Sequence, residues 1–302
     1  MDISVVIPTY NRVTLLARCL NSLFYQDIYK GHQRHEIILA LDSRDEITED
    51  WAKSQKIIQA GVKIARAQKG GANSARNAGI NIAKGHIIFF LDDDCFVPDK
   101  TWMEKVLYNF KENKEAAVIG GKYLLRNNSC LSEFVRNQLD NFYLENNRIK
   151  GCRVRALLGG NSGYRKTIFK EYGLFDEFIS YGGAETEMNL RITEGGGKMC
   201  LNDNISVFHQ KEHDHFLSYF LKSFRQGKGS GYIQSKHGSF ERLPCFGSKR
   251  TWCLQVVQET KGKLFFRLAA GFFFFFNAVF YWGGFVAGFY SFEFMSLFFK
   301  KA

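Results

Sequence analysis

The sequence is poor in the signals that mark several common classes of protein. Its seven cysteines among 302 residues are scattered, odd in number and never spaced as C-x-x-C, which argues against a zinc motif and favours reduced thiols in a cytosolic compartment. It has no zinc-finger spacing, no RNA-binding aromatic signature and no long Lys/Arg block, so nucleic acid is not an expected partner. The first residues have neither a basic segment nor a long apolar run, so secretion is not expected.

Charge and aromatic content are the unusual features that are present. The formal charge is +11 and the pI is about 9.2, and 30 residues are Phe, many of them in the last forty positions. Such a charge fits an anionic membrane surface or a nucleotide-like substrate. The length allows one large domain, or one domain with an appendage.

Strand and helix patterns alternate up to about residue 120. Apolar runs predict strands, and apolar residues at helical spacing predict helices, with Asn11 as the N-cap of the first helix. The predicted strands are 3–7, 36–41, 62–65, 87–91 and 117–121. Three helices are predicted: one that begins at residue 13, one over 72–83 and one over 102–110. This alternation predicts a mostly parallel sheet covered by helices. Ligands bind beyond the carboxyl ends of such strands, so Thr9, Asp42 and Asp92 are expected to share one crevice.

Three carboxylates, Asp92, Asp93 and Asp94, directly follow the apolar run 87–91. In an extended chain Asp92 and Asp94 point to one side and Asp93 to the other. Two carboxylates on one side suit Mg²⁺ or Mn²⁺, with substrate phosphates completing the shell. The alternative is an acidic turn after a strand. The triplet favours a metal–diphosphate enzyme.

The second half of the chain is less regular. Residues 122–150 are mostly polar and are interpreted as an excursion over the site, while 157–164 carry a glycine-rich turn and 182–194 a helix. Residues 268–292 contain no charged residue and lie between basic residues, and they include Gly284 and Gly288 at the spacing of helix contacts in membranes. We expect this tail to associate with a membrane, either spanning it or lying on its surface, although packing on the catalytic domain is an alternative.

Six short motifs follow one another in a specific order. They are residues 5–12 (VVIPTYNR), 75–79 (ARNAG), 90–94 (FLDDD), 160–165 (GNSGYR), 173–177 (GLFDE) and 182–187 (GGAETE). Together they resemble the family-2 glycosyltransferases with the GT-A fold, over about residues 2–235. The resemblance implies a Rossmann-like, mostly parallel sheet flanked by helices and an inverting, metal-dependent transfer. The uncharged stretch 268–292 adds the expectation of a hydrophobic helical tail after this catalytic domain.

The resemblance also assigns roles to individual residues. The nucleotide-sugar would be bound by Pro8, Thr9, Tyr10, Arg12, Asp42, Arg76, Asp92 and Asp93, and Mn²⁺ or Mg²⁺ by Asp92, Asp94 and His209. Asp93 is expected in a second shell or pointing outward. A turn-forming cap is the alternative for Asp42, and a solvated helix-face charge is the alternative for Arg76. His213 or His215 is an alternative to His209, and basic residues of 224–229 are expected to close over the diphosphate.

The catalytic base is expected at Glu185. The family pattern has an acidic pair after the glycines, and this chain has Ala184 and Glu185 instead. Residues two apart on a helix do not share a face, so Glu187 is expected to pair with Arg191 four residues on. Cys95, beside the acidic triplet, is interpreted as a small buried filler.

These observations predict three regions: a nucleotide-binding half (1–121), an acceptor half (122–235) and a membrane-associating tail (236–302). The expected reaction moves a sugar from a nucleotide-diphosphate donor, preferably a UDP-sugar, to a glycan or lipid-linked acceptor. The expected setting is polysaccharide or glycolipid synthesis at the cytoplasmic face of a membrane. Two other functions stay open: a nucleotidyltransferase, which would need a phosphate loop after the first strand, and a non-catalytic nucleotide-binding scaffold.

Overall fold

A computed structural model describes most of the chain in two units. The described residues are 2–27, 35–55, 57–125, 131–179, 183–210, 216–238, 279–288 and 290. The first unit comprises residues 1–180 and 185–211, and the second comprises 181–184 and 212–302.

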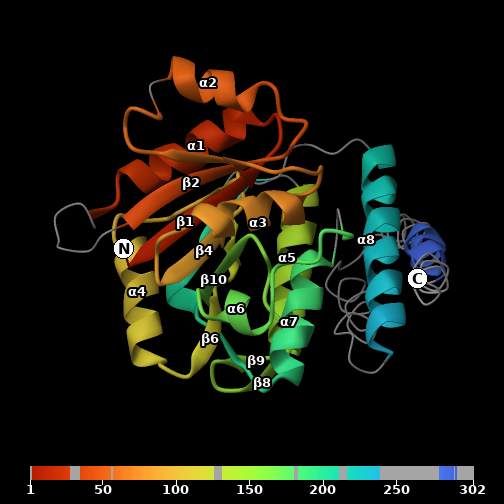
Figure 1. Ribbon diagram of the computed structural model, residues 1–302. Helices are drawn as coiled ribbons and strands as arrows, with labels where there is room; N and C mark the ends of the chain where they lie inside the picture. Colours follow the sequence, from red (N-terminus) through yellow and green to blue (C-terminus); the bar gives the residue numbers. More distant parts are fainter. Residues whose placement is uncertain are drawn as a thin grey trace. The chain divides into compact units, whose positions relative to one another are not determined.

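The first unit is built on a nine-stranded mixed sheet with the strand order β3-β2-β1-β4-β10-β6-β11-β9-β8. Figure 1 labels its central strands β2, β1, β4, β10 and β6. Strands β1 to β4 run parallel to one another, and β6 and β11 form a second parallel pair, whereas β10 is antiparallel to both its neighbours β4 and β6. The strands are β1 (Ile3–Thr9), β2 (His35–Leu41), β3 (Lys63–Arg66), β4 (Ile87–Leu91), β6 (Ala116–Gly120), β8 (Arg148–Lys150), β9 (Arg153–Val154), β10 (Asn161–Arg165) and β11 (Lys198–Leu201).

A small three-stranded sheet stands beside the acidic triplet. It has the order β5 (Cys95–Phe96), β12 (Val207–His209) and β7 (Tyr123–Leu124). The antiparallel register of β5 and β12 places His209 directly opposite Cys95. Side chains of directly opposed residues lie on the same face, so this pairing brings His209 to the start of the strand that follows Asp94.

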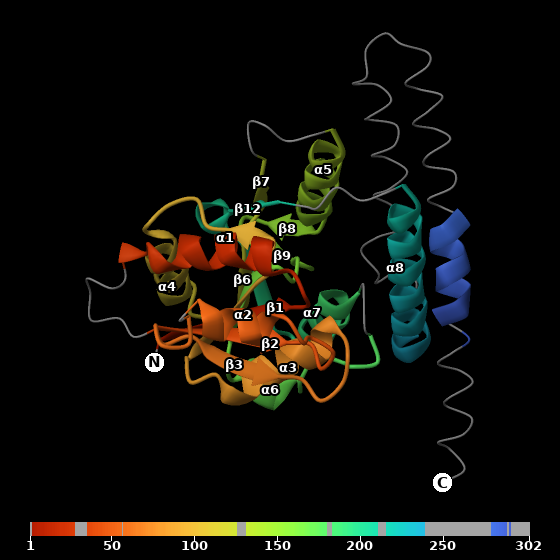
Figure 2. The ribbon, with the colours of Figure 1, turned by 90° about the horizontal axis from the view of Figure 1, so that it is seen from above.

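Helices cover both faces of the large sheet, so its central strands are apolar on both sides. Helices α1 (Val13–Phe24) and α4 (Trp102–Glu112) lie on one face, and α3 (Ala72–Ile82) and α6 (Ile168–Glu171) lie on the other (Figure 2). Alternate residues of β1 divide accordingly: Val5 packs in the core with the first pair of helices, and Val6 packs in the core with the second pair. The remaining helices of this unit are α2 (Thr48–Ser54), α5 (Leu131–Asn146) and α7 (Ala184–Glu194).

The predicted alternation of strands and helices up to residue 120 is confirmed, although helix α2 was not predicted, and three further details differ. The excursion 122–150 contains helix α5, and the glycine-rich turn continues into strand β10. Asn11 does not cap the first helix. Its φ is +53°, and its N–H donates to Asp45 Oδ2 at 2.9 Å, so the helix begins only at Val13 with Arg12 at the N-cap position.

The second unit contains two helices in close contact, α8 (Phe216–His237) and the helix 279–288. A Cβ atom added to Gly227, Gly284 or Gly288 would collide with a backbone carbonyl oxygen of the facing helix. Only glycine permits backbones to approach so closely. Of the helices in the described ranges, none is long and apolar enough to cross a membrane. Most of the predicted tail 268–292 lies outside those ranges.

Candidate active site

The predicted site residues gather at the carboxyl edge of the parallel strands. Thr9 ends β1, Asp42 follows β2 and Asp92 follows β4. Because β10 is antiparallel, its first residue lies at this same edge, where the Asp92 N–H donates to the Gly160 carbonyl at 3.2 Å. The convergence of Thr9, Asp42 and Asp92 at one edge follows from the parallel order of β2, β1 and β4.

The acidic triplet forms a turn rather than an extended strand. Strand β4 ends at Leu91, and the Cys95 N–H donates to the Asp92 carbonyl at 2.9 Å, which closes the turn. Side-chain alternation therefore does not apply to the three carboxylates, and of the two expectations for Asp93 the outward one is wrong, whereas a second-shell place stays a prediction. Asp93 is 3% exposed and accepts hydrogen bonds from Thr9 Oγ1 at 2.8 Å and Arg12 Nη1 at 2.7 Å.

Arg12 links the second and third carboxylates of the triplet. Its Nη1 pairs with Asp93, and its Nη2 lies 2.8 Å from Asp94 Oδ2. The other oxygen of Asp94 lies 3.1 Å from His209 Nε2. Burial disfavours ionisation of Asp94, but His209 and Arg12 outweigh it and hold the pKa of Asp94 well below its usual range. At Asp93, burial outweighs the charge of Arg12 and raises the pKa.

Asp94, Cys95 and His209 offer a set of metal ligands. One ligating atom from each residue lies within 4.8 Å of the other two. The buried Nδ1 of His209 has no hydrogen-bond partner among the described residues, so this nitrogen is unsatisfied. Carboxylate oxygen suits Mg²⁺ or Mn²⁺, and imidazole and thiolate suit transition metals. This donor set fits a divalent cation, and it adds Cys95, which the sequence pattern marked only as a filler.

Asp92 faces a different partner. Its Oδ1 lies 3.3 Å from Nη2 of Arg76, a residue that is 6% exposed and lies on α3. Its assignment as a metal ligand stays a prediction, because its carboxylate is not part of the Asp94–Cys95–His209 set. The alternative interpretation of Arg76 as a solvated surface charge is wrong, since its guanidinium is buried beside Asp92.

Two glycines allow the chain to pass between these charged groups. A Cβ atom on Gly160 would collide with the Asp92 carboxylate. A Cβ atom on Gly159 would lie 3.2 Å from Arg76 Nη2 and 3.3 Å from Glu185 Cβ. The glycine-rich turn seen in the sequence therefore has a steric role, because it lets Arg76, Asp92 and Glu185 surround one stretch of backbone.

Glu185 and Glu187 differ in their surroundings although both begin α7. Burial raises the pKa of Glu185, and the nearby charge of Arg76 lowers it by less. Glu187 is fully buried and accepts from Arg191 Nε at 2.9 Å and Nη2 at 2.7 Å. The predicted Glu187–Arg191 pair is confirmed. Arg191 also donates to the Leu174 carbonyl, so this pair fixes α7 against the preceding loop.

Asp42 is held by the turn that follows β2. It accepts from Arg44 Nε at 2.8 Å, Arg44 Nη2 at 2.9 Å and the Gly71 N–H at 2.6 Å, and the Arg44 hydrogen bonds above all lower the pKa of Asp42 to about 2. The Arg44 guanidinium also stacks 5.0 Å from the centroid of the Tyr10 ring. Sequence reasoning did not single out Arg44.

Pro8, also a predicted donor-binding residue, is buried within β1 and pairs with Ala40.

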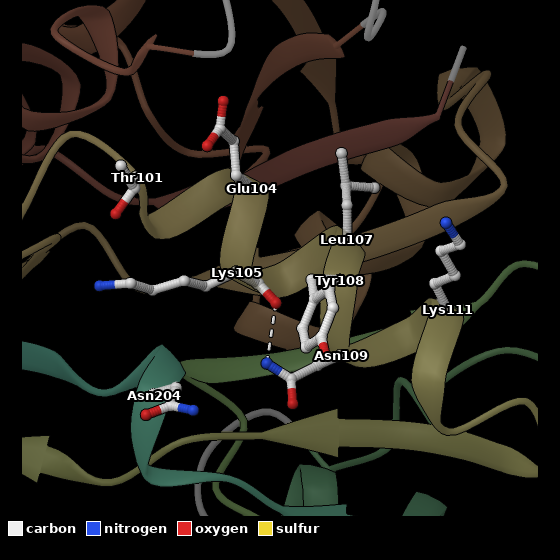
Figure 3. A pocket seen from close by; sticks show the side chains of 8 residues that line it. All are labelled: Thr101, Glu104, Lys105, Leu107, Tyr108, Asn109, Lys111 and Asn204. Atoms are coloured by element: carbon white, nitrogen blue, oxygen red, sulfur yellow. Dashed lines mark hydrogen bonds between the residues drawn. The ribbon is translucent and has the colours of Figure 1, made fainter.

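A groove along α4 contains none of the predicted site residues. Figure 3 shows its lining, in which Asn109 Nδ2 donates to the Lys105 carbonyl at 2.8 Å. It is lined by Thr101, Glu104, Lys105, Leu107, Tyr108, Asn109, Lys111 and Asn204.

His213 and His215, the alternatives to His209, lie outside the described residues, and residues 224–229 belong to the second unit, in α8.

The profile of glycosyl transferase family 2 matches residues 4–173, more than half of the chain. The chain belongs to glycosyl transferase family 2. The resemblance drawn from the six motifs is thereby confirmed.

Several characterised proteins are similar to this chain in sequence. Glycosyltransferase AglE of Haloferax volcanii is 23% identical over 228 residues, covering 75% of this chain and 72% of the relative. Poly(ribitol-phosphate) beta-glucosyltransferase of Bacillus spizizenii is 35% identical over 127 residues, covering 40% of this chain. Chondroitin synthase of Escherichia coli is 26% identical over 243 residues. The chain spans only 19% and 34% of the last two relatives.

Solved glycosyltransferases share the fold. The mannosyltransferase PcManGT from Pyrobaculum calidifontis, in complex with GDP-Man and Mn²⁺, superposes with a TM-score of 0.64 at 12% identity, covering 95% of this chain and 86% of that one. S. aureus TarS 1–349 in complex with UDP-GlcNAc gives 0.55 at 15% identity, covering 87% and 77%. At such identities the likeness shows the fold alone, and it confirms a GT-A-like α/β architecture.

Proposed function

We propose that this family-2 glycosyltransferase moves a sugar from a nucleotide-diphosphate donor to an acceptor hydroxyl, with inversion and with a divalent cation. One observation carries the proposal. The chain places a ligand set (Asp94, Cys95 and His209) and a candidate base (Glu185 beside Arg76) at the ends of strands and helices that meet at one sheet edge. A metal-dependent transfer needs both parts, one for the leaving group and one for the acceptor.

On the donor side, the chain's own residues bind and orient. Asp42 and Tyr10 lie at the end of the β1–β2 pair and would receive the base and ribose of the donor, once Arg44 gives up part of its contact with Asp42. Asp94 and His209 would hold the cation, with Cys95 beside them, and the cation when bound would neutralise charge on the diphosphate leaving group. Arg12 keeps Asp93 and Asp94 in place by pairing with both.

On the acceptor side, Glu185 would take the proton of the attacking hydroxyl. Attack from the side opposite the diphosphate gives inversion, and it requires no nucleophilic carboxylate on the donor side. The raised pKa of Glu185 improves its strength as a base, provided that the carboxyl is ionised. Arg76 would hold Asp92 and keep positive charge near the diphosphate.

The donor and acceptor are proposed only by class. A UDP-sugar is our preferred donor, with a GDP-sugar as the competitor, because solved structures of the same fold hold either GDP-Man or UDP-GlcNAc. A glycan or lipid-linked acceptor is proposed because relatives include a poly(ribitol-phosphate) glucosyltransferase and a teichoic acid biosynthesis protein. The net charge of +11 supports a place at the cytoplasmic face of a membrane.

The test is release of nucleoside diphosphate from a panel of UDP-, GDP- and dTDP-sugars with Mn²⁺, Mg²⁺ or EDTA. We expect one donor to be hydrolysed or transferred in an EDTA-sensitive manner, and Asp94→Ala to abolish this. Asp99→Asn is the control, because Asp99 is a half-exposed carboxylate whose partners are Lys105 on α4 and the nearby Thr101. It should retain full turnover.

Two other outcomes have defined meanings. Turnover that survives both EDTA and Asp94→Ala would contradict the metal-dependent mechanism. Tight nucleotide binding without turnover, even after membrane extract is added as a source of acceptor, would support the non-catalytic scaffold instead. Ala184 and Glu185, which replace the usual acidic pair, are the feature that motivates this second candidate.

A further inference from the structure

Two cysteines far apart in the sequence meet at the end of the large sheet remote from β3. The Sγ atoms of Cys152 and Cys200 lie 2.8 Å apart, although the two residues are 48 positions apart in the chain. Both are free thiols in the structure. A disulfide has a sulfur–sulfur distance of about 2.0 Å, so the two atoms need to approach by less than about 1 Å to bond.

The surrounding strands hold this pair in place. Cys200 lies within β11, and Cys152 directly precedes β9, which is antiparallel to β11. The Leu201 N–H donates to the Cys152 carbonyl at 2.7 Å, which fixes the two backbones beside each other at the level of the thiols. Cys200 is part of the buried core, and Cys152 packs against that core. The approach is therefore part of the sheet and not a chance contact of two surface side chains.

The two thiols differ in access to solvent. Cys152 is half-buried, whereas Cys200 is buried, and burial together with the Cys152 hydrogen bond raises the pKa of Cys200 to about 12. An external reagent meets Cys152 first. Cys200 is then positioned to react only with its neighbour, which is the arrangement of an attacking and a resolving thiol. Cys19 and Cys95, the other free thiols among the described residues, are buried.

We propose that Cys152 and Cys200 form a reversible disulfide, a modification site that links β9 to β11. The oxidant is a small-molecule disulfide such as oxidised glutathione. The Cys152 thiolate attacks one of its sulfurs and releases one glutathione thiolate, and the Cys200 thiolate then attacks the Cys152 sulfur and releases the second. Two cysteine thiols are oxidised, one small disulfide is reduced to two thiols, and the protons of both cysteines pass to the released thiolates.

The bond would close a loop that contains the acceptor side of the site. Gly159, Gly160 and Glu185 all lie between Cys152 and Cys200 in the chain. A crosslink across such a loop restricts the unfolded chain and so stabilises the folded one. The oxidised protein is therefore expected to melt at least about 4 °C above the reduced protein.

The experiment equilibrates the full chain with oxidised and reduced glutathione, traps remaining thiols by alkylation, and maps the peptides by mass spectrometry. We expect a peptide pair joined through Cys152 and Cys200, reversed by excess reduced glutathione. Cys152→Ser and Cys200→Ser should each abolish the joined pair and the rise in Tm. Cys19→Ala, which removes a thiol outside this pair, should retain both.

The peptide map of the wild-type protein shows whether the Cys152–Cys200 disulfide forms, even if a variant folds poorly. Alkylation of both Cys152 and Cys200 after full equilibration with oxidised glutathione would overturn the proposal. A stable adduct of glutathione on Cys152, or a bond from either residue to a different cysteine, would overturn it as well. None of these outcomes depends on transferase activity.

Discussion

The two sides of the candidate site differ in how firmly the protein holds their charged groups. On the metal side, Arg12 and His209 contact Asp94 at 2.8 and 3.1 Å, and Asp93 is buried with two donors. On the acceptor side, the ion pair beside Glu185 is longer, 3.3 Å between Arg76 and Asp92.

This difference fits the two functions proposed for the site, which are positioning of a cation and transfer of a proton. Carboxylates that must bind a cation repeatedly in one geometry benefit from partners that lock their orientation. A base must instead keep lone pairs available for the acceptor proton, and burial without a tight ion pair raises its pKa. The neighbouring Glu187 shows the opposite case, since Arg191 occupies its carboxylate. The same residue type on one helix therefore has two different environments.

The largest expected effect tests this contrast between Glu185 and Glu187. We expect Glu185→Gln to lower kcat by about 10²–10⁴-fold with little change in nucleotide affinity, because it removes the proton acceptor. Glu187→Gln should instead lower stability and leave kcat of the folded fraction within a few-fold of wild type. Single-turnover rates and nucleotide titrations measure both variants. Equal losses of kcat in the two variants would remove the distinction.

The next effect is a change of rate with pH. As the proposed base, Glu185 would act in its charged form, and its pKa is raised, so kcat should fall about tenfold per pH unit below that raised pKa and level off above it. The midpoint of this acid limb is expected above the ordinary range of a glutamate. Glu185→Asp should retain a limb, whereas the residual rate of Glu185→Gln should lack it. A midpoint at or below the ordinary glutamate value would contradict the environment described for this side chain.

The smallest effect concerns stability on the metal side. At a pH above the raised pKa of Asp93, Arg12→Met leaves a buried carboxylate without its cation, which should lower the free energy of unfolding by about 1–3 kcal/mol, given that Arg12 is itself partly exposed. Adding Asp93→Asn should recover part of this loss, because the uncompensated charge is then gone. Urea unfolding of the two single variants and the double variant gives the coupling energy. Strictly additive losses would show that Arg12 and Asp93 act independently.

The sequence predicted the strands and helices that have strong patterns, and it missed elements that depend on distant neighbours. Strands β1 and β4 are continuous apolar runs because helices cover both of their faces. Strand β10 reads Asn-Ser-Gly-Tyr-Arg, which has no strand pattern of its own, and it exists because β4 and β6 pair with it on either side. Helix α5 is mostly polar, so its apolar periodicity is too weak to identify it.

The site residues show the same limit. The strand ends and the motifs located Thr9, Asp42, Arg76, Asp94 and Glu185 at or beside the sheet edge. The predicted outward orientation of Asp93 was wrong because side chains alternate between faces only in an extended chain, and the triplet forms a turn. Cys95 approaches His209 because β5 pairs with β12, and the two residues are 114 positions apart in the sequence. No local sequence pattern predicts a pairing over that distance. For Arg44 a signal existed, namely a basic residue two positions after an aspartate in a turn.

The glycine contacts of the second unit have a consequence for how that unit tolerates genetic change. On the helix 279–288, Gly284 and Gly288 lie against the backbone of α8, while Val279, Trp282 and Val286 are about half exposed. Replacement of either glycine pushes two helix axes apart, whereas replacement of an exposed residue alters only a surface. Inherited variation should therefore accumulate along one side of this helix and be nearly absent along the other.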